Sequence, residues 1–587
     1  MIILAGPAMR LIPPAVGITA LPVGGPVSGE HDRATFSTGP NTEAQLVALR
    51  HLDGIAFQQA STVPGRGDSP VPGPVGAGPL ASRVPWPLVG VLVVQAALSL
   101  RLTWSNTAFE DEALYLWVGH MEWAHWLHGA PVQPFQTWFS GAPVLYPPIA
   151  AVADSVGGLA AARLLSLVFM AGVTCFLWGT ARCLVGSRAA LVAVAAFATL
   201  AGTAFLGAFA TYDALALLLL AGATWIAVRA GHRSGRAARR GTPRLSGACV
   251  LAGLVLGLAC AVKYASALFV PLVLTVAALA AWREPGSGSG SAPGSREPAP
   301  GPSGRRRAVT ALLSTAAGLA LTLAAALAVG GHAYWEGVLV TTLNRPPATS
   351  SPFTVLKLSY LWTGFVVVAA ALALLASRGE RAVNRWLVGI LAAAVLLVPL
   401  EQARVDTTVS LHKHVVFGAW FASMAAGYLF ARLSVIDKTR GWAALAAIPV
   451  IAGTLLMSIP QATALFTGWQ NTSPVVASLP QLLARYPGDY LTSADLYQVL
   501  GYYDQGRVGW PRWQSDLHLS APGARPGLAS DRVAIRGHYF SLIIIGTQRG
   551  TITSTDEAVI ADIRQASGYR VVADAGGFEA WTSVEGS

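Results

Sequence analysis

The chain has 587 residues, of which 53% are hydrophobic and 12% are charged, and its mean hydropathy is +0.52. A soluble globular protein needs more polar surface than this, so the composition excludes that class and indicates an integral membrane protein. The net charge of +11 does not indicate nucleic acid binding, because the arginines sit in short loops between apolar runs and no basic-aromatic face is present.

Residues 1–84 are rich in Pro, Gly and Ser and carry scattered charges. They show no sustained hydrophobic period, which is typical of a segment that cannot bury a core. We predict a disordered tail here, or a start of translation that has been assigned too early.

The region 85–460 predicts a bundle of membrane-spanning helices, each of which requires about 20 mostly apolar residues. The stretch 144–158 is apolar but short and is interrupted by Pro147, Pro148 and Asp154, so we interpret it as re-entrant or interfacial. The fold class expected is an all-α polytopic membrane bundle. Eleven segments meet the rule: 85–104, 162–184, 188–206, 209–228, 247–262, 264–282, 308–330, 358–376, 386–402, 415–431 and 441–459.

The basic residues predict the orientation of this bundle. Four loops, 229–246, 283–307, 377–385 and 432–440, are rich in arginine and alternate with loops that are not. Since positive loops remain in the cytoplasm, these four are cytoplasmic, with 284–304 as a flexible Gly/Ser/Pro linker. The first long loop, 105–162, contains no Lys or Arg and is therefore predicted to be extracytoplasmic. We expect a multi-pass protein of the plasma membrane.

Residues 461–587 have a different character and predict a small α/β domain, which the parity of the spans makes extracytoplasmic. Apolar runs at 490–492, 541–546, 569–572 and 578–582 are typical of strands. Helical periodicity occurs near 475–486, 494–503 and 555–567.

The first outer loop contains three consecutive carboxylates, Glu110, Asp111 and Glu112. Asn106 or Thr107 can cap a helix that starts near Phe109, and the following apolar residues recur at helical spacing, which predicts an amphipathic helix in the outer interface. Ionisable groups next to a bilayer are functional-site candidates. At the start of a helix the dipole favours the ionised form of a carboxylate, whereas neighbouring carboxylates disfavour it. A general base working near neutral pH would use these two opposed effects on its pKa. The alternative is a solvated acidic start of a helix.

The same topology brings further polar groups to the outer face. Positive charge on that side indicates a phosphate ligand, since Arg and Lys both bind phosphate; contact with lipid headgroups is the alternative. Two histidine sets also suggest zinc. For the pair at 412 and 414 the ligand count favours contact with phosphate or lipid, and His120, His125 and His128 beside Glu122 are interpreted as interfacial side chains, so no metal or cofactor is predicted. The groups on this face are Tyr212, Asp213, Lys263, Tyr264, Arg345, Lys357, Arg404, His412, Lys413 and His414.

These motifs together resemble the GT-C integral-membrane glycosyltransferases, the group that includes protein O-mannosyltransferases and lipid A aminoarabinose transferases. The resemblance covers about 85–430 and rests on short motifs in a common order: Asp111-Glu112-Ala113-Leu114-Tyr115, Tyr146-Pro147-Pro148, Arg163-Leu164-Leu165-Ser166, Tyr212-Asp213-Ala214-Leu215 and Gly257 to Tyr264. Two departures concern phosphate binding, since some relatives have Lys at the position of Tyr146 and Arg-Tyr where this chain has His412-Lys413-His414.

The resemblance implies transfer of a sugar from a polyprenyl-phosphate donor to a protein, glycan or lipid acceptor on the extracytoplasmic side, usually with inversion. Asp111 would be the catalytic carboxylate, in the role of general base, and Asp213 the second acid. The alternatives are a transporter or flippase for a lipid-linked phosphate and a carbohydrate-binding membrane protein without catalysis. The residues predicted to bind the substrate are Glu112, Tyr115, Tyr146, Tyr212, Lys263, Tyr264, Arg345, Arg404, His412, Lys413 and His414.

Overall fold

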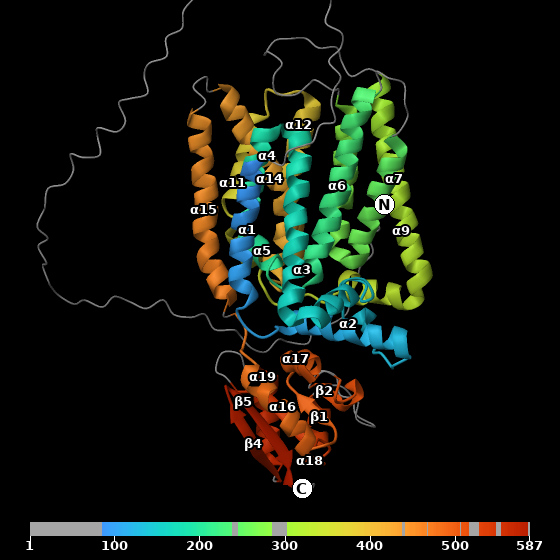
Figure 1. The fold of residues 1–587 in the computed structure, drawn as a ribbon, viewed down its shortest axis with the longest axis vertical. Coiled ribbons are helices and arrows are strands. Elements are labelled where there is room, and N and C mark those ends of the chain that lie inside the picture. Colours follow the sequence, from blue (N-terminus) through green and yellow to red (C-terminus); the bar gives the residue numbers. More distant parts are fainter. Residues whose placement is uncertain are drawn as a thin grey trace, which may run out of the picture. The chain divides into compact units, whose positions relative to one another are not determined.

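The computed structural model describes residues 85–237, 245–283, 302–436, 441–466, 468–504, 506–515, 528–547, 553–566 and 568–584, all within one unit, Ser82–Ser587. The predicted tail 1–84 and most of the predicted linker 284–304 lie outside the described residues. Figure 1 shows a helical bundle, with a helix across one of its ends and an α/β domain beyond that end.

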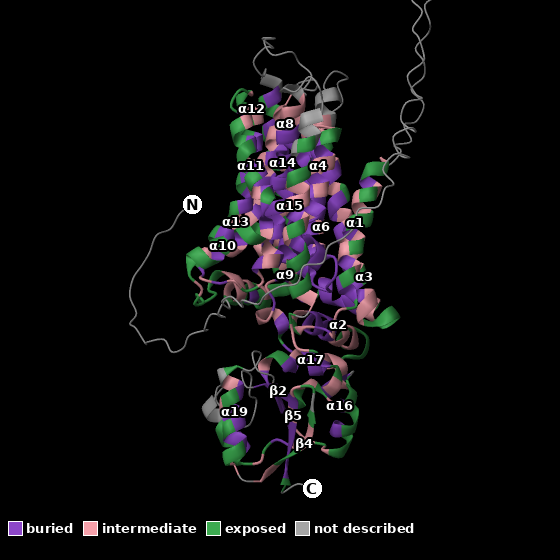
Figure 2. Ribbon diagram, turned by 90° about the vertical axis from the view of Figure 1, so that its left-hand side faces the viewer, coloured by how far each residue is buried: buried purple, intermediate pink, exposed green. Residues whose placement is uncertain are grey.

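The bundle consists of long apolar helices and several shorter pieces that interrupt them. Figure 2 shows that the buried residues run through its centre, along α14 and α6, while exposed residues lie on the outside. The elements are α1 (Trp86–Thr103), α3 (Tyr146–Val185), α4 (Ser187–Ala198), α5 (Ala201–Leu206), α6 (Tyr212–Ala237), α7 (Leu245–Val262), η3 (Tyr264–Phe269), α8 (Val270–Trp282), α9 (Pro302–Val338), η4 (Leu339–Leu343), α10 (Pro352–Thr363), α11 (Phe365–Ala376), α12 (Ala382–Ala393), η5 (Ala394–Leu396), α13 (Leu397–Arg404), α14 (Leu411–Ile436) and α15 (Gly441–Phe466).

The fold class predicted from the sequence is confirmed. Within the described residues, eight helices are long and apolar enough to cross a membrane, and α10 with α11, bent by 88°, makes a ninth candidate. Two shorter apolar helices, Ser187–Ala198 and Ser246–Val262, complete the set. Each of the eleven predicted segments coincides with one of these helices or with the bent pair.

The stretch 144–158, predicted as re-entrant or interfacial, forms the first part of α3. The helix breaks at Gly157 and Gly158, where Gly158 has a φ of 65°, so this part is an arm bent away from the span that follows. The arm packs on α2 (Glu110–His128), where Trp123 Nε1 donates a hydrogen bond to the carbonyl of Pro148 at 2.9 Å. The two helices approach so closely that a Cβ on Gly119 would lie 2.1 Å from the Pro147 carbonyl oxygen, so only glycine fits.

Helix α2 lies across the end of the bundle (Figure 1) and begins at Glu110 with Phe109 as N-cap. The expected cap by Asn106 or Thr107 is wrong. Instead, the Phe109 N–H donates to the Glu112 side chain at 3.4 Å, and the Thr107 hydroxyl contacts Thr472 at 2.8 Å. The loop before α2 is thus tied to the segment that follows α15, and this connection fixes where the helix starts.

The C-terminal region contains the predicted sheet, with strand order β2-β1-β3-β5-β4. Strands β2, β1 and β3 are parallel, and β5 is antiparallel to both β3 and β4. The sequence missed the short strand β2 and helix α18. The strands are β1 (Tyr490–Thr492), β2 (Trp513–Ser515), β3 (Leu542–Gly546), β4 (Tyr569–Ala575) and β5 (Phe578–Ser583); the helices are α16 (Ser473–Arg485), α17 (Ala494–Asp504), η6 (Trp510–Arg512), α18 (Leu528–Arg536) and α19 (Ser554–Gln565), and η1 (Phe135–Thr137) lies in the first loop.

Helices cover both faces of this sheet. Because neighbouring residues of a strand point to opposite faces, Ile544 packs in the cluster with α16 and α17, while Ile543 packs with α18 and α19. Trp117 of α2 belongs to the first of these clusters. The α/β domain therefore shares apolar packing with the helix that crosses the end of the bundle.

Candidate active site

The carboxylate of Asp111 pairs with Lys413 at the end of the bundle that α2 crosses. Asp111 lies in the first turn of α2, and Lys413 lies in the first turn of α14. Lys413 Nζ is 2.5 Å from Asp111 Oδ2, and the two side chains are 4% and 32% exposed, respectively. The lysine is thus withdrawn from solvent while the carboxylate keeps an open side.

A second pair, Asp213 with Lys263, is more deeply buried. Lys263 Nζ is 2.6 Å from Asp213 Oδ1, with side chains 3% and 0% exposed, and Asp213 Oδ2 has no hydrogen-bond partner among the described residues. The charge of Lys413 acts on Asp213 as well as on Asp111. The four residues therefore form one electrostatic cluster built from α2, α6, α14 and the junction of α7 with η3.

The backbone around Lys263 is shaped by a crossing loop. Lys263 itself is extended, with a φ of −146°, between α7 and η3. The Tyr264 N–H donates to the Ser140 carbonyl and the Ala142 N–H donates to the Ala261 carbonyl, both at 2.8 Å. A Cβ on Gly141 would lie 2.0 Å from the Val262 carbonyl oxygen, so the glycine permits the contact that holds the break open.

Tyrosines line the cluster. The rings of Tyr115 and Tyr212 are 4.7 Å apart, those of Tyr115 and Tyr146 are 6.0 Å apart, and Lys263 Nζ lies 4.5 Å from the centroid of Tyr212. Burial, with the nearby charges of Asp111 and Asp213, raises the pKa of Tyr115, so its phenol stays neutral and can donate a hydrogen bond. Tyr264 stacks edge-on with Tyr334 at 5.6 Å, and its hydroxyl has no partner within the described residues.

The predicted residues His412 and His414 flank Lys413 at the start of α14. His412 contacts the rings of Phe205 at 4.5 Å and Trp362 at 5.4 Å, so it packs among aromatic side chains. His414 is only partly exposed and interacts electrostatically with Asp213 and Lys263. The aromatic packing fixes the first turn of α14 and with it the position of Lys413.

Arg345 and Arg404 lie apart from the cluster. Arg345 is exposed in the segment after η4. Arg404 is exposed at the end of α13 and pairs with Glu401 at 2.5 Å. No described contact joins either arginine to the Asp111 or Asp213 pair.

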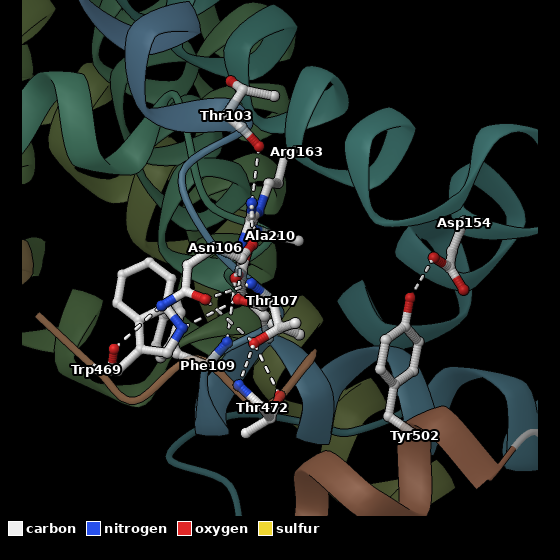
Figure 3. A network of polar contacts seen from close by, with 12 residues as sticks. Thr103, Asn106, Thr107, Phe109, Asp154, Arg163, Ala210, Trp469, Thr472 and Tyr502 are labelled. Atoms are coloured by element: carbon white, nitrogen blue, oxygen red, sulfur yellow. Dashed lines mark hydrogen bonds and ion pairs between the residues drawn. The ribbon is translucent and has the colours of Figure 1, made fainter. Parts of the chain in front are cut away.

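Arg163, which the resemblance included in a motif without a role, is the most connected side chain near the site. It is 1% exposed and uses all five of its N–H groups. Two of them donate to Glu112, at 2.8 and 2.7 Å. The other three donate to the backbone carbonyls of Thr103, at the end of α1, and of Asn106 and Thr107 in the loop before α2, as Figure 3 shows.

Glu112 is likewise fully engaged. Besides Arg163, its oxygens accept from the Ala210 N–H at 2.8 Å and from the Phe109 N–H at 3.4 Å, and the residue is 0% exposed. This leaves no face for a substrate, so we interpret the predicted binding residue Glu112 as a positioning residue. It orients its neighbour Asp111 and the segment that leads to Asp213. An arginine inside an apolar span was the sequence signal for this pair.

Helix α17 of the α/β domain contacts the arm of α3 next to α2. The Tyr502 hydroxyl donates to Asp154 Oδ1 at 2.7 Å (Figure 3), and Asp154 Oδ2 lies 2.7 Å from His120 Nε2. The pairing between Tyr502 and Asp154 was not predictable from the sequence, because the two residues are 348 positions apart. Desolvation, with the charges of Asp111 and Asp495, raises the pKa of Glu110 to about 7, and Lys413 opposes this shift.

Within the described ranges, no group of three or more His, Cys, Asp or Glu side chains is arranged to hold a metal ion. Of the histidines on α2, His120 pairs with Asp154, and His125 Nδ1 lies 2.8 Å from the Ala130 carbonyl. These partners give both histidines a structural explanation.

Residues 145–286 match the family described as dolichyl-phosphate-mannose-protein mannosyltransferase. No curated protein sequence matches the chain. Several solved structures, however, are similar to the structure of this chain. ArnT from Cupriavidus metallidurans, bound to undecaprenyl phosphate, is 13% identical with a TM-score of 0.52, over 84% of this chain and 97% of ArnT.

Two further structures share the architecture. AglB, the oligosaccharyltransferase of Archaeoglobus fulgidus, in complex with an inhibitory peptide and a dolichol-phosphate, is 13% identical with a TM-score of 0.52, over 85% of this chain and 74% of AglB. The arabinofuranosyltransferase AftD from Mycobacteria is 17% identical with a TM-score of 0.52, over 84% of this chain and 40% of AftD. At these identities the similarity establishes the fold.

Proposed function

We propose that the chain transfers a sugar from a polyprenyl-phosphate donor to an acceptor hydroxyl. The GT-C glycosyltransferase fold, which the sequence motifs predicted, supports this proposal. The acceptor is a protein, a glycan or a lipid. The proposed donor class is supported by ArnT, whose structure contains undecaprenyl phosphate, and by AglB, whose structure contains a dolichol-phosphate.

The observation that carries this proposal is the cluster of two carboxylate–lysine pairs at one end of an apolar bundle. Displacing a phosphate from an anomeric carbon requires a base for the incoming hydroxyl and cations for the leaving group. The cluster contains both kinds of group. Its buried lysines act where water is scarce, so their charges are weakly screened.

In the proposed reaction, Asp111 removes the proton from the acceptor hydroxyl as its oxygen attacks the anomeric carbon. The bond from that carbon to the phosphate oxygen breaks, and the phosphate leaves with the electron pair. Lys413 and Lys263 stabilise its charge, and Asp213 holds Lys263 in place. Attack opposite the leaving group inverts the configuration at the anomeric carbon.

The remaining predicted residues have binding roles in this proposal. Tyr115, Tyr146, Tyr212 and Tyr264 form the walls around the sugar, and His412 and His414 fix the turn that carries Lys413. The exposed Arg345 and Arg404 contact the donor or lipid headgroups at the rim. No metal takes part in the proposed mechanism.

We propose that the site and the α/β domain face the extracytoplasmic side of the plasma membrane. In Figure 1, the connection between α11 and α12 lies at the end of the bundle away from α2, and Arg378, Arg381 and Arg385 lie on or next to it. Because positively charged loops stay in the cytoplasm, this distribution supports an outward-facing site.

The test is an assay of the purified full-length chain with a panel of polyprenyl-phosphate sugars and cell-envelope acceptors. We expect release of free polyprenyl phosphate together with transfer of the sugar to one acceptor. A lipid transporter would instead move the donor across a vesicle membrane with its sugar intact. Recovery of every donor unchanged, in the presence of envelope acceptors, would overturn the proposal.

A further inference from the structure

A hollow of about 310 Å³ lies far from the candidate active site, between the beginning of α1, the last turns of α3 and the beginning of α4. In Figure 1 these segments lie toward the end of the bundle away from α2. The residues that line the hollow are Pro85, Trp178, Arg182, Ser187, Arg188 and Leu191.

The connection between α3 and α4 brings two positive charges to this hollow. Helix α3 ends at Val185 and α4 begins at Ser187, with Gly186 between them at a φ of 96°. This single-residue connection places Arg182 and Arg188 on the lining of the same hollow. Both side chains are exposed, so an anion that enters the hollow can reach two positive charges at once.

The described residues supply no counter-ion to the two arginines. In the part of the chain that the structure describes, neither guanidinium has an ion pair or a side-chain hydrogen bond. Arg283, by contrast, donates a hydrogen bond to the Leu184 carbonyl of the same α3 terminus. The donors of Arg182 and Arg188 are therefore available to a ligand, and their forked geometry suits phosphate oxygens.

The beginning of α4 adds weaker support. Its N-cap is Gly186, and no side chain caps the helix. The backbone N–H groups of the first turn therefore lack intrahelical acceptors and favour an anion.

Apolar surroundings favour a lipid over a soluble anion. Beside the arginines, the lining of the hollow has apolar side chains in Trp178, which is 9% exposed, and in the half-buried Leu191. Trp86 and Val93 of α1 are 84% and 61% exposed, as expected for side chains that face acyl chains. An anion whose apolar tails lie along α1 matches both features.

We propose that this hollow binds the phosphate of an anionic glycerophospholipid, with Arg182 and Arg188 as its ligands. The site is separate from the donor site, and the inference does not depend on the proposed function. A general attraction of arginine to headgroups would act equally at other arginines of the same end of the bundle. The proposal assigns the binding to these two.

The test is native mass spectrometry of the full-length chain in detergent, titrated with phosphatidylglycerol. We expect the wild type to bind one high-affinity lipid. The variant R182Q/R188Q should bind it at least about tenfold more weakly, because two charge-assisted contacts are lost. The control R378Q/R385Q removes two exposed arginines from the same end and should bind phosphatidylglycerol like the wild type.

Four further results decide the assignment. Equal loss of lipid in both double variants, or in neither, would overturn the proposal. R182K/R188K should recover part of the affinity, since lysine keeps the charge and loses the fork, and the unfolding temperature of each variant reports whether it is folded. Phosphatidylcholine should bind more weakly than phosphatidylglycerol. Displacement of the lipid by millimolar inorganic phosphate would show that a free anion suffices and would contradict a lipid site.

Discussion

Two sets of buried ion pairs lie within the same end of this bundle, and they differ in how completely they are satisfied. In the pair Glu112–Arg163, every guanidinium donor and both carboxylate oxygens have partners. In the lysine pairs, Asp213 Oδ2 has no partner among the described residues, and Asp111 keeps an exposed side. We call a buried ion pair saturated when all its hydrogen-bond donors and acceptors have partners, and such a pair fixes structure. An unsaturated pair, with a free acceptor or an exposed side, retains the capacity to bind and react.

The difference gives adjacent residues opposite roles. Asp111 and Glu112 are neighbours in a run of three acids, and the sequence alone offers no reason to separate them. One faces the cluster, and the other faces Arg163 inside the protein. Substitutions at these acids and at their neighbours test this division.

The largest effect should follow from breaking the saturated pair. Glu112→Gln leaves Arg163 charged and buried, so we expect a loss of about 3–5 kcal/mol in the free energy of unfolding. Thermal unfolding in detergent measures this. The control is Glu401→Gln, which breaks the exposed pair with Arg404 and should cost about 0–1 kcal/mol. Equal stability of the two variants would remove the distinction.

The second effect concerns binding by the unsaturated pairs. Lys263→Met removes a charge that the proposal assigns to the donor phosphate, so the affinity for polyprenyl phosphate should fall about 10- to 100-fold. Lys263→Arg keeps the charge and serves as the control. The measurement is a binding titration of the purified variants. Unchanged affinity in Lys263→Met would place the phosphate elsewhere.

A smaller effect is expected where the α/β domain meets the arm of α3. Tyr502→Phe removes one hydrogen bond to Asp154, and Asp154 keeps its contact with His120. The free energy of unfolding should therefore fall by about 0.5–1.5 kcal/mol. Hydrogen exchange should be faster in α17 and unchanged in α14. Tyr360→Phe, at an exposed position of α10, should change neither helix.

The smallest effect is the pH dependence that Glu110 contributes. Its pKa is raised from 4.5 to about 7 in the folded protein, so the folded state binds this proton more tightly than the unfolded state does. The corresponding stability is complete below the ordinary pKa and is lost as the pH rises through about 7. Glu110→Gln should reduce the dependence of the unfolding temperature on pH between the ordinary pKa of 4.5 and about 7. The same pH dependence in the variant as in the wild type would contradict the shift in the pKa of Glu110.

The sequence predicted the bundle well because a membrane span needs a long apolar run, which a single sequence displays. It also brought Asp111, Asp213, Lys263 and Lys413 to one end of the bundle through the parity of the spans. It did not predict which acid pairs with which base. That depends on local geometry, such as the extended backbone at Lys263 and the close approach at Gly141.

The contacts of the α/β domain were not predictable either. The partners Tyr502 and Asp154 are separated by most of the chain, and neither belongs to a motif. Strand β2 was missed because Trp513-Gln514-Ser515 shows no apolar run, and the nine-residue helix α18 was missed as well. Helix α2 was predicted as an amphipathic helix in the outer interface, but the sequence did not predict that its Trp117 would pack against α17.

The most direct test of the division between the two acids is to measure turnover and unfolding temperature together for Asp111→Asn. Loss of a general base should lower sugar transfer by about 10²- to 10⁴-fold. The unfolding temperature should stay near that of the wild type, in contrast to Glu112→Gln. Near-normal transfer by Asp111→Asn, or a loss of stability as large as that of Glu112→Gln, would contradict the account.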